Sequence, residues 1–232
     1  IAETITGVAG DSPADVPQLL RALGFYCAVV IIGLAIQVFA SYPLLIRLFT
    51  PLHLRQFFRG IVQAQLVAFS TRSSAAALPV TMKSARSNLG ISEEVASFVL
   101  PLGATVNMDG TALYQAVAAV FIAQTLGIPL DLTAQMTIVL MAMLASIGTA
   151  AVPSAGIVML IVILETIGVP AAGVAMILGV DQILDMLRTA ANITGDVAVA
   201  AIVASSEGQL VPAGLAVGSD GPRPIGPDAP ES

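Results

Sequence analysis

The chain has 232 residues, of which 56% are apolar and only 10% are charged, and its formal net charge is −6. Because a soluble domain of this size carries roughly a quarter charged residues, the composition excludes an ordinary soluble globular domain. Residues 22–46 carry no charge, and as a helix this stretch is about 37 Å long, enough to cross a bilayer with some tilt. The sequence therefore predicts an all-α, multi-pass protein of the cell membrane.

The remaining composition narrows the possible partners. The single cysteine, Cys27, lies within an apolar run and predicts no disulfide. The negative charge comes largely from the termini, and we expect a lipid bilayer but no nucleic acid, cofactor or enzymatic activity. The chain begins at Ile1 without a recognisable signal peptide, so we interpret it as a fragment of a longer protein.

The first part of the chain predicts one simple crossing and one broken segment. Residues 1–20, with their glycines and prolines, predict a polar external connection, and residues 21–51 predict a transmembrane helix. Residues 52–88 predict a first re-entrant hairpin, because their centre at residues 70–79 is small, hydroxyl-rich and broken by Pro79.

The second part repeats this alternation. Residues 95–127 predict a discontinuous transmembrane helix, interrupted by polar residues near its middle. Residues 132–168 predict a second re-entrant hairpin, the lid, with its break at residues 145–156. Residues 172–207 predict a last transmembrane helix, and the proline- and glycine-rich residues 208–232 predict a disordered tail.

The two broken segments are the informative pattern. Unpaired backbone groups cannot face lipid, so an irregular backbone at membrane depth lies inside protein or lines a wet cavity. A pair of interrupted apolar segments in matching positions is typical of a transporter binding site. Two ordinary helices, each kinked at proline, remain the alternative.

The distribution of basic residues predicts how the hairpins enter the membrane. The first hairpin is flanked by five of them, Arg47, Arg55, Arg59, Lys83 and Arg86. Basic residues mark cytoplasmic loops, so this hairpin is expected to enter from the cytoplasm. The second follows one further crossing and is expected to enter from outside, which gives an inverted repeat.

Charged residues inside the apolar segments are candidates for function, because each one is costly in lipid when unpaired. They are Asp109, Asp181, Asp185, Arg188 and Asp196. At 100° per residue, the last four and Asn192 fall within an arc of about 80° on one helix. They therefore form one polar stripe, for which a solvated helix face is the alternative.

The charge balance of this region predicts bound cations. The four aspartates, together with Arg188 and Arg72, sum to −2, and an acidic amino acid would add about −1. If all four aspartates are ionised, cations must supply the missing positive charge. Hard cations take oxygen ligands, and the sequence has no histidine or cysteine cluster for a transition metal.

Four motifs carry a resemblance to a known family. They are SSAAALP at 73–79, NMDGT at 107–111, SIGT at 146–149 with the proline-glycine break after it, and DMLRT at 185–189 leading to NITGD at 192–196. In this order they resemble the dicarboxylate/amino acid:cation symporter family, which includes glutamate transporters and archaeal aspartate transporters. The resemblance runs from about residue 20 to 210 and covers only that family's C-terminal half. It implies uptake of aspartate or glutamate with sodium by an elevator-type movement, in a homotrimer built through the N-terminal half.

The resemblance also implies residue roles. Arg188 would bind the substrate's side-chain carboxylate and Asp185 its ammonium group. The other implied substrate residues are Thr189, Asn192, Thr111, Ser73, Ser74, Val152 and Gly156. One sodium site would use the Asp196 carboxylate with carbonyls of Gly103, Asn107 and Asn192. A second would use carbonyls of Thr105, Ser146, Ile147 and Thr149. A third would use the side chains of Asn107 and Asp109 with groups on an earlier helix.

Single positions discriminate among related activities. Neutral amino acid exchangers lack the arginine that matches Arg188, and C4-dicarboxylate carriers, the main alternative, differ around this helix. Gln115 replaces a proton-carrying glutamate of vertebrate carriers, and Arg72, which matches the prokaryotic arrangement, is expected near Asp185 or at the cytoplasmic surface. Coupling to protons in place of sodium stays open.

Two other classes explain less of the sequence. An intramembrane aspartyl protease would need Asp109 and Asp185 to share a proton, but it leaves the arginine and both hairpins unexplained. A passive channel needs rings of ligands from several subunits, which this asymmetric charged core does not offer.

Overall fold

The computed structural model describes residues 15–210, so the expected connection before residue 15 and the expected tail after residue 210 lie outside the described range. Within that range the protein is helical, and the only strand-like pairing is an isolated bridge between Ile91 and Leu210. Three helices are long and apolar enough to cross a membrane: Pro17–Phe49, Glu93–Thr125 and Leu178–Ser206. The described chain is therefore an all-α protein with the spans of a membrane protein.

The first long rod has three parts, α2 (Asp15–Ile36), a π-helical segment η1 (Gln37–Ser41) and α3 (Tyr42–Phe49). The rod begins at Asp15, six residues before the expected start at residue 21, so the prediction of a connection was wrong for residues 15–20. Pro17 does not prevent this earlier start, because it lies in the first turn, where a helix tolerates proline since that N–H has no intrahelical partner.

The first hairpin consists of α4 (Leu54–Thr71) and α5 (Ser74–Leu89), which pack against each other. Arg72 reverses the chain with a left-handed φ of 54°, and the Ser73 hydroxyl caps α5 by accepting from the Ala76 N–H. The next rod consists of α6 (Glu93–Val106) and α7 (Asp109–Thr125), separated by the non-helical residues Asn107 and Met108.

The second hairpin consists of α8 (Leu132–Ile147) and α9 (Ala155–Thr166), separated by residues 148–154. A 3₁₀ segment, η2 (Ala171–Met176), then leads into α10 (Leu178–Ser206). The last helix was expected from residue 172, but its first turns are this tighter segment. A Cβ at Gly173 would lie 2.4 Å from Ile122, so the glycine lets the segment press against α7.

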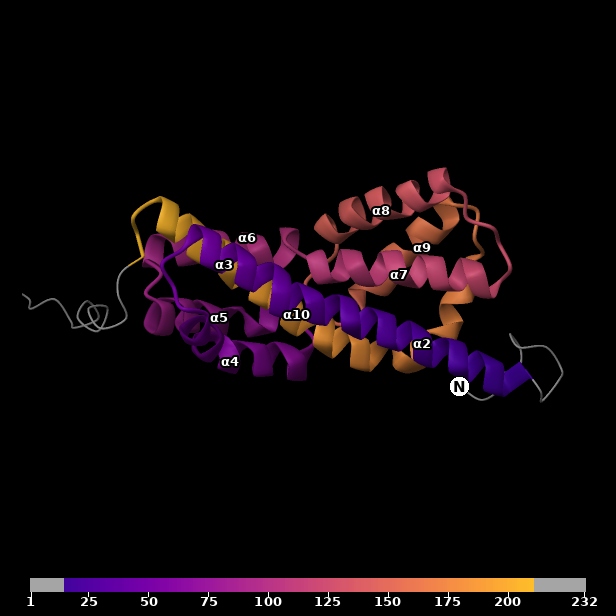
Figure 1. Cartoon of the computed structure of the whole chain (residues 1–232), viewed down its shortest axis with the longest axis horizontal. Helices are drawn as coiled ribbons and strands as arrows, with labels where there is room; N and C mark the ends of the chain where they lie inside the picture. Colours follow the sequence, from indigo (N-terminus) through magenta and orange to yellow (C-terminus); the bar gives the residue numbers. More distant parts are fainter. Residues whose placement is uncertain (1–14, 211–232) are drawn as a thin grey trace, which may run out of the picture.

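The helices form an elongated bundle with the two hairpins at opposite ends (Figure 1). Their tips meet near the middle, where the Ser73 hydroxyl donates to the Ala151 carbonyl over 2.7 Å. Helix α10 lies at the centre and packs against α2 to α7. The fold therefore brings two helix breaks and the middle of α10 to the same level of the bundle.

Two large apolar clusters hold this arrangement, with a smaller third one around Ala68, Ala77 and Ile193. One lies around Tyr26, Tyr114 and Ile163 beside the second hairpin, and the other around Ile46, Phe57 and Leu100 beside the first. The outside carries large exposed apolar side chains, such as Phe25 and Phe39 on the first rod. Such a surface suits contact with lipid or with further protein.

Candidate substrate and cation site

The polar stripe of α10 is buried. Asp181, Asp185, Arg188, Asn192 and Asp196 are each no more than 4% exposed. The alternative of a solvated helix face is therefore wrong, since neighbouring helices cover the stripe.

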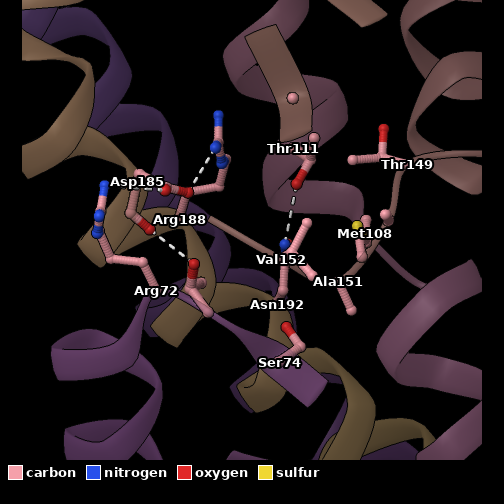
Figure 2. A pocket seen from close by; sticks show the side chains of 13 residues that line it. Arg72, Ser74, Met108, Thr111, Thr149, Ala151, Val152, Asp185, Arg188 and Asn192 are labelled. Atoms are coloured by element: carbon pink, nitrogen blue, oxygen red, sulfur yellow. Dashed lines mark hydrogen bonds and ion pairs between the residues drawn. The ribbon is translucent and has the colours of Figure 1, made fainter. Parts of the chain in front are cut away.

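A small cavity of about 20 Å³ lies between the hairpin tips and the middle of α10 (Figure 2). Eight of the nine expected substrate residues line it: Ser74, Thr111, Val152, Gly156, Asp185, Arg188, Thr189 and Asn192. The ninth, Ser73, is not among the lining residues, and its hydroxyl bonds to the Ala151 carbonyl instead. Arg72, Met108, Thr149, Ala150 and Ala151 complete the lining.

The Arg188 guanidinium is buried between an aspartate and an aromatic ring. Its Nη2 lies 2.5 Å from Asp185 Oδ1, and its Cζ lies 4.3 Å from the centre of the Tyr114 ring. Its Nη1 is buried without a hydrogen-bond partner among the described residues. A Cβ at Gly156 would lie 3.0 Å from this nitrogen, so only glycine lets the second hairpin approach so closely.

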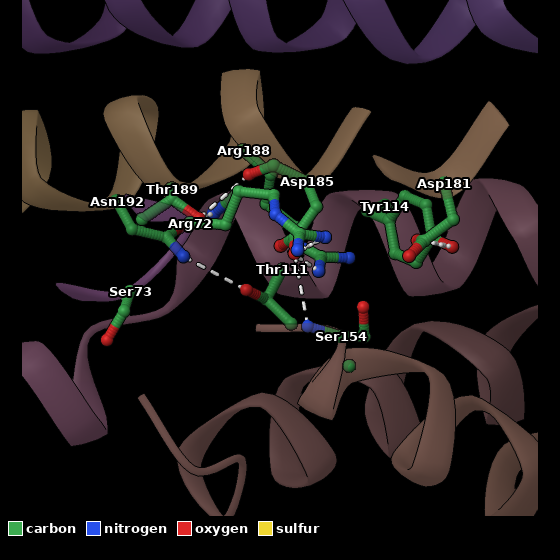
Figure 3. A network of polar contacts seen from close by, with 12 residues as sticks. Arg72, Ser73, Thr111, Tyr114, Ser154, Asp181, Asp185, Arg188, Thr189 and Asn192 are labelled. Carbon is green, nitrogen blue, oxygen red and sulfur yellow. Dashed lines mark hydrogen bonds and ion pairs between the residues drawn. The ribbon is translucent and has the colours of Figure 1, made fainter. Parts of the chain in front are cut away.

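Asp185 connects both hairpins to α10 (Figure 3). Besides Arg188, its carboxylate accepts from the Ser154 backbone N–H over 3.1 Å and lies 3.8 Å from Arg72 Nη1. The expectation that Arg72 lies near Asp185 is thus confirmed. Because Ser154 belongs to the break of the second hairpin, this carboxylate holds that hairpin against the cavity.

Further polar contacts surround the cavity. Asn192 donates to the Thr111 hydroxyl over 3.0 Å and accepts from the Gly110 N–H over 2.9 Å. The Thr189 hydroxyl donates to the Asp185 carbonyl, so in this conformation it bonds within its own helix. These bonds fix the wall that α7 and α10 share.

Helix α7 also reaches the second hairpin. Gln115, which is fully buried, donates to the Gly156 carbonyl over 3.0 Å. Its neighbour Tyr114 lies under the Arg188 guanidinium and donates to Asp181 Oδ1 over 2.6 Å. Tyr114 therefore links two charged residues of α10 that lie seven positions apart.

Two groups of expected cation ligands come together at the break between α6 and α7. Asn107 Nδ2 donates to Asp196 Oδ1 over 3.1 Å, and a Cβ at Gly103 would lie 2.9 Å from the same oxygen. Asp109 accepts from the Gly110 N–H over 3.0 Å and from the Tyr42 hydroxyl over 2.6 Å. Two carboxylates and the side-chain amide of Asn107 thus gather around one helix break.

The remaining expected ligands lie at the ends of α6 and α8, which contact each other. Ser146 and Ile147 form the last turn of α8, where helix carbonyls lack intrahelical partners, and Thr149 is buried just beyond. Thr105 is exposed, and its hydroxyl bonds to the Leu102 carbonyl. Residues 15–210 contain no group of three or more histidine, cysteine, aspartate or glutamate side chains that could hold a metal ion.

Several site residues were missed by sequence reasoning. Tyr42 and Tyr114 bind aspartates, the Ser154 N–H binds Asp185, and Gln65 donates to the buried Thr194 hydroxyl over 2.9 Å. A tyrosine within an apolar span carries no signal of its own. The distinguishing feature is its partner, which lies 67 residues away in both tyrosine pairs.

The geometry gives no support to a protease. A catalytic pair of carboxylates must share one proton at close range. Asp109 instead bonds to Tyr42 and Gly110, whereas Asp185 bonds to Arg188 and Ser154. The two carboxylates therefore serve different parts of the structure.

Fold and site together define a membrane-embedded helical bundle with a buried polar cavity between two broken helical segments. The profile of the Sodium:dicarboxylate symporter family matches residues 4–206, and the chain belongs to this family.

Named relatives agree with this assignment. Human excitatory amino acid transporter 2 is 47% identical over 182 residues, which are 78% of this chain and 32% of the relative. An excitatory amino acid transporter of Caenorhabditis elegans is 46% identical over 189 residues, with coverages of 82% and 38%. Mouse excitatory amino acid transporter 5 is 45% identical over 184 residues, with coverages of 79% and 33%. The chain thus spans only about a third of the length of these relatives.

Proposed function

We propose that the complete protein is a secondary active symporter that takes up acidic amino acids together with sodium. The observation that carries this proposal is Arg188, a buried guanidinium beside the cavity with one nitrogen left without a partner among the described residues. Buried donors cost free energy until they are paired, and a guanidinium fork suits a carboxylate. The names of the relatives agree with an acidic amino acid as the ligand.

The remaining cavity groups suit the rest of an amino acid. Asp185 would bind the substrate ammonium once the bond from Arg188 shifts to the substrate carboxylate. Thr189, Asn192 and Thr111 offer hydroxyl and amide groups along the same wall. Ser73, Ser74, Val152 and Gly156 would enclose the ligand from the two hairpin tips.

Sodium fits the groups around Asp109 and Asp196. Hard cations prefer carboxylate, carbonyl and amide oxygens, and the break at Asn107 brings such groups together with Gly103 and Asn192 close by. A second site would use the carbonyls of Thr105, Ser146, Ile147 and Thr149 at the meeting of α6 and α8. Bound cations would offset the aspartates that the two arginines leave unpaired.

The hairpins are proposed to be re-entrant. Helix α9 has 12 residues and α8 has 16, so they are about 18 Å and 24 Å long, shorter than the roughly 30 Å hydrocarbon core. With their tips at the middle of the bundle, neither arm needs to cross the bilayer. We further propose an elevator-type movement in the cell membrane, within a homotrimer formed through the part of the protein that precedes this chain.

The second hairpin is proposed to be the lid. The cavity of about 20 Å³ suits roughly one water molecule and is too small for an amino acid. Entry of a substrate therefore requires the bonds from Ser73, Gln115 and Ser154 to open. All three of these hydrogen bonds involve the tip of the second hairpin, whereas only the Ser73 bond involves the tip of the first.

The test uses the purified full-length protein in liposomes. Labelled aspartate, glutamate and succinate are offered separately under an inward sodium gradient, an inward proton gradient, or choline alone. We expect aspartate or glutamate to accumulate with sodium only. Accumulation of succinate would favour the dicarboxylate alternative, accumulation with protons would overturn sodium coupling, and no accumulation with any gradient would overturn the symporter.

A further inference from the structure

The π-helical segment Gln37–Ser41 interrupts the first rod immediately before Tyr42. A π turn inserts one extra residue relative to an α-helix, and such insertions often occur at functional sites. One residue corresponds to a rotation of about 100°, so the insertion changes the side of the rod on which Tyr42 lies. None of the five π-helical residues is buried, whereas Tyr42 is 4% exposed.

Tyr42 contacts a residue of the candidate cation site. Its hydroxyl donates to Asp109 Oδ2 over 2.6 Å, while Asp109 Oδ1 accepts from the Gly110 N–H over 3.0 Å. Both carboxylate oxygens are therefore held, each by a donor from a different side. This pair of bonds fixes the rotation of the carboxylate at the start of α7.

The same hydroxyl lies beside the second carboxylate group. A Cβ at Gly195 on α10 would lie 2.6 Å from the Tyr42 hydroxyl and 3.3 Å from Asn107 Nδ2. That amide donates to Asp196 Oδ1, on the residue after the glycine. The absence of a side chain at Gly195 thus makes room for Tyr42 between Asp109 and Asp196.

We propose that Tyr42 is a positioning residue for sodium, holding the Asp109 carboxylate in the orientation in which it binds the ion. The inference rests on the sodium coupling proposed above and adds a residue to it. A phenol that donates its proton to a carboxylate keeps its own lone pairs, and the carboxylate keeps further acceptor sites. The bond therefore orients the carboxylate oxygens of Asp109 and leaves them lone pairs with which to bind sodium.

The hydroxyl and the ring of Tyr42 have separable roles. The ring belongs to the apolar cluster of Ile46, Phe57 and Leu100, so Tyr42→Phe keeps this packing and removes only the oxygen. Tyr26→Phe is the matched control, because its buried hydroxyl makes no hydrogen bond to any described residue and its ring stacks on Phe121.

The experiment measures binding of ²²Na⁺ to the full-length protein in nanodiscs without amino acid. Without the Tyr42 hydroxyl the Asp109 carboxylate must be ordered when the ion binds, so we expect Tyr42→Phe to weaken sodium binding about tenfold and Tyr26→Phe to change it less than twofold. Unchanged or tighter binding in Tyr42→Phe would overturn the inference. If the wild-type protein bound no sodium, the proposed coupling itself would fail.

A second variant tests the same oxygen from α10. Gly195→Ala places a methyl group against the Tyr42 hydroxyl and should also weaken sodium binding. In the double variant the hydroxyl is gone, so its loss should be smaller than the sum of the two single losses. Fully additive losses would overturn the inference. The midpoint of thermal unfolding, measured with and without sodium, reports whether each variant folds.

Discussion

The two hairpins are alike in outline and differ in how they are held. The first breaks over two residues, Arg72 and Ser73, and both of its helices pack directly on α10. The second breaks over residues 148–154, and its helices pack on α7. Its break reaches α10 through the hydrogen bond from the Ser154 N–H to Asp185.

This difference agrees with the roles proposed for the two hairpins, a fixed wall and a movable lid. The first hairpin is bound by apolar packing along its whole length, and its sharp turn is capped by a side chain. The second packs on α7 through an apolar cluster of its own, and its tip is bound by hydrogen bonds from Ser73, Gln115 and Ser154. A few such bonds at the tip can open and reform, which agrees with the proposed role of the second hairpin as the lid.

The largest expected effect comes from the residue that both hairpins surround. Arg188→Gln removes a buried charge and leaves Asp185 without its main partner, which typically costs about 3–5 kcal/mol. We expect aspartate and glutamate binding to the full-length protein, measured by calorimetry, to weaken at least a hundredfold. The control is Arg86→Gln, a partly exposed arginine paired with Glu93. Equal affinities of the two variants would contradict the assignment of the cavity.

The next largest effect is expected where the second hairpin contacts Arg188. Gly156→Ala brings a methyl group to 3.0 Å from Arg188 Nη1, so the lid cannot close without moving the guanidinium. We expect substrate affinity to fall about tenfold, which corresponds to about 1.4 kcal/mol. Gly24→Ala is the control, because nothing lies within 4 Å of its added Cβ. Normal affinity in Gly156→Ala would show that the lid does not close on Arg188.

The contact between the hairpins should have a smaller effect. Ser73→Ala removes the bond to Ala151 and should raise the rate of substrate dissociation about fivefold, as expected for one neutral hydrogen bond. The substitution also removes a helix cap. Ser92→Ala removes a comparable cap at α6, away from the lid, and should leave the dissociation rate unchanged. Stopped-flow dissociation measures both, and equal rates would mean that this bond does not hold the lid.

Arg72 should have the smallest effect, although it belongs to the first hairpin. Its nitrogen lies 3.8 Å from Asp185, and its side chain is 26% exposed. Partly exposed pairs contribute about 1 kcal/mol or less, so Arg72→Gln should weaken substrate binding at most about fivefold. Added choline chloride should shrink the difference at constant sodium. A loss as large as that of Arg188→Gln would place Arg72 in direct contact with substrate.

The charged stripe and the helix breaks were readable from sequence because both violate the pattern of an apolar span. Arg188 and Asp196 stand out in lipid on energetic grounds, and Gly148 and Pro153 lie in the break of the second hairpin. The expectation that Pro79 breaks the first hairpin was wrong, because Pro79 lies inside α5 and the chain turns at Arg72 instead. Tyr42 was not readable, since an aromatic residue in a span resembles any packing residue. Its role depends on the π-helical segment before it and on Gly195 across the interface, neither of which has a local signature.

Helix α10 carries the proposed amino acid contacts and a proposed sodium contact on one unbroken element. Arg188 and Asp196 are eight positions apart, or about 12 Å along the axis, and Asn192 stands midway between them. Because the helix is continuous, it fixes the distance and the relative orientation of Arg188 and Asp196. Insertion of one residue between Asn192 and Asp196 would rotate the Asp196 side chain about the helix axis by about 100°. Arg188 would stay in place, so sodium binding should be lost separately from amino acid binding.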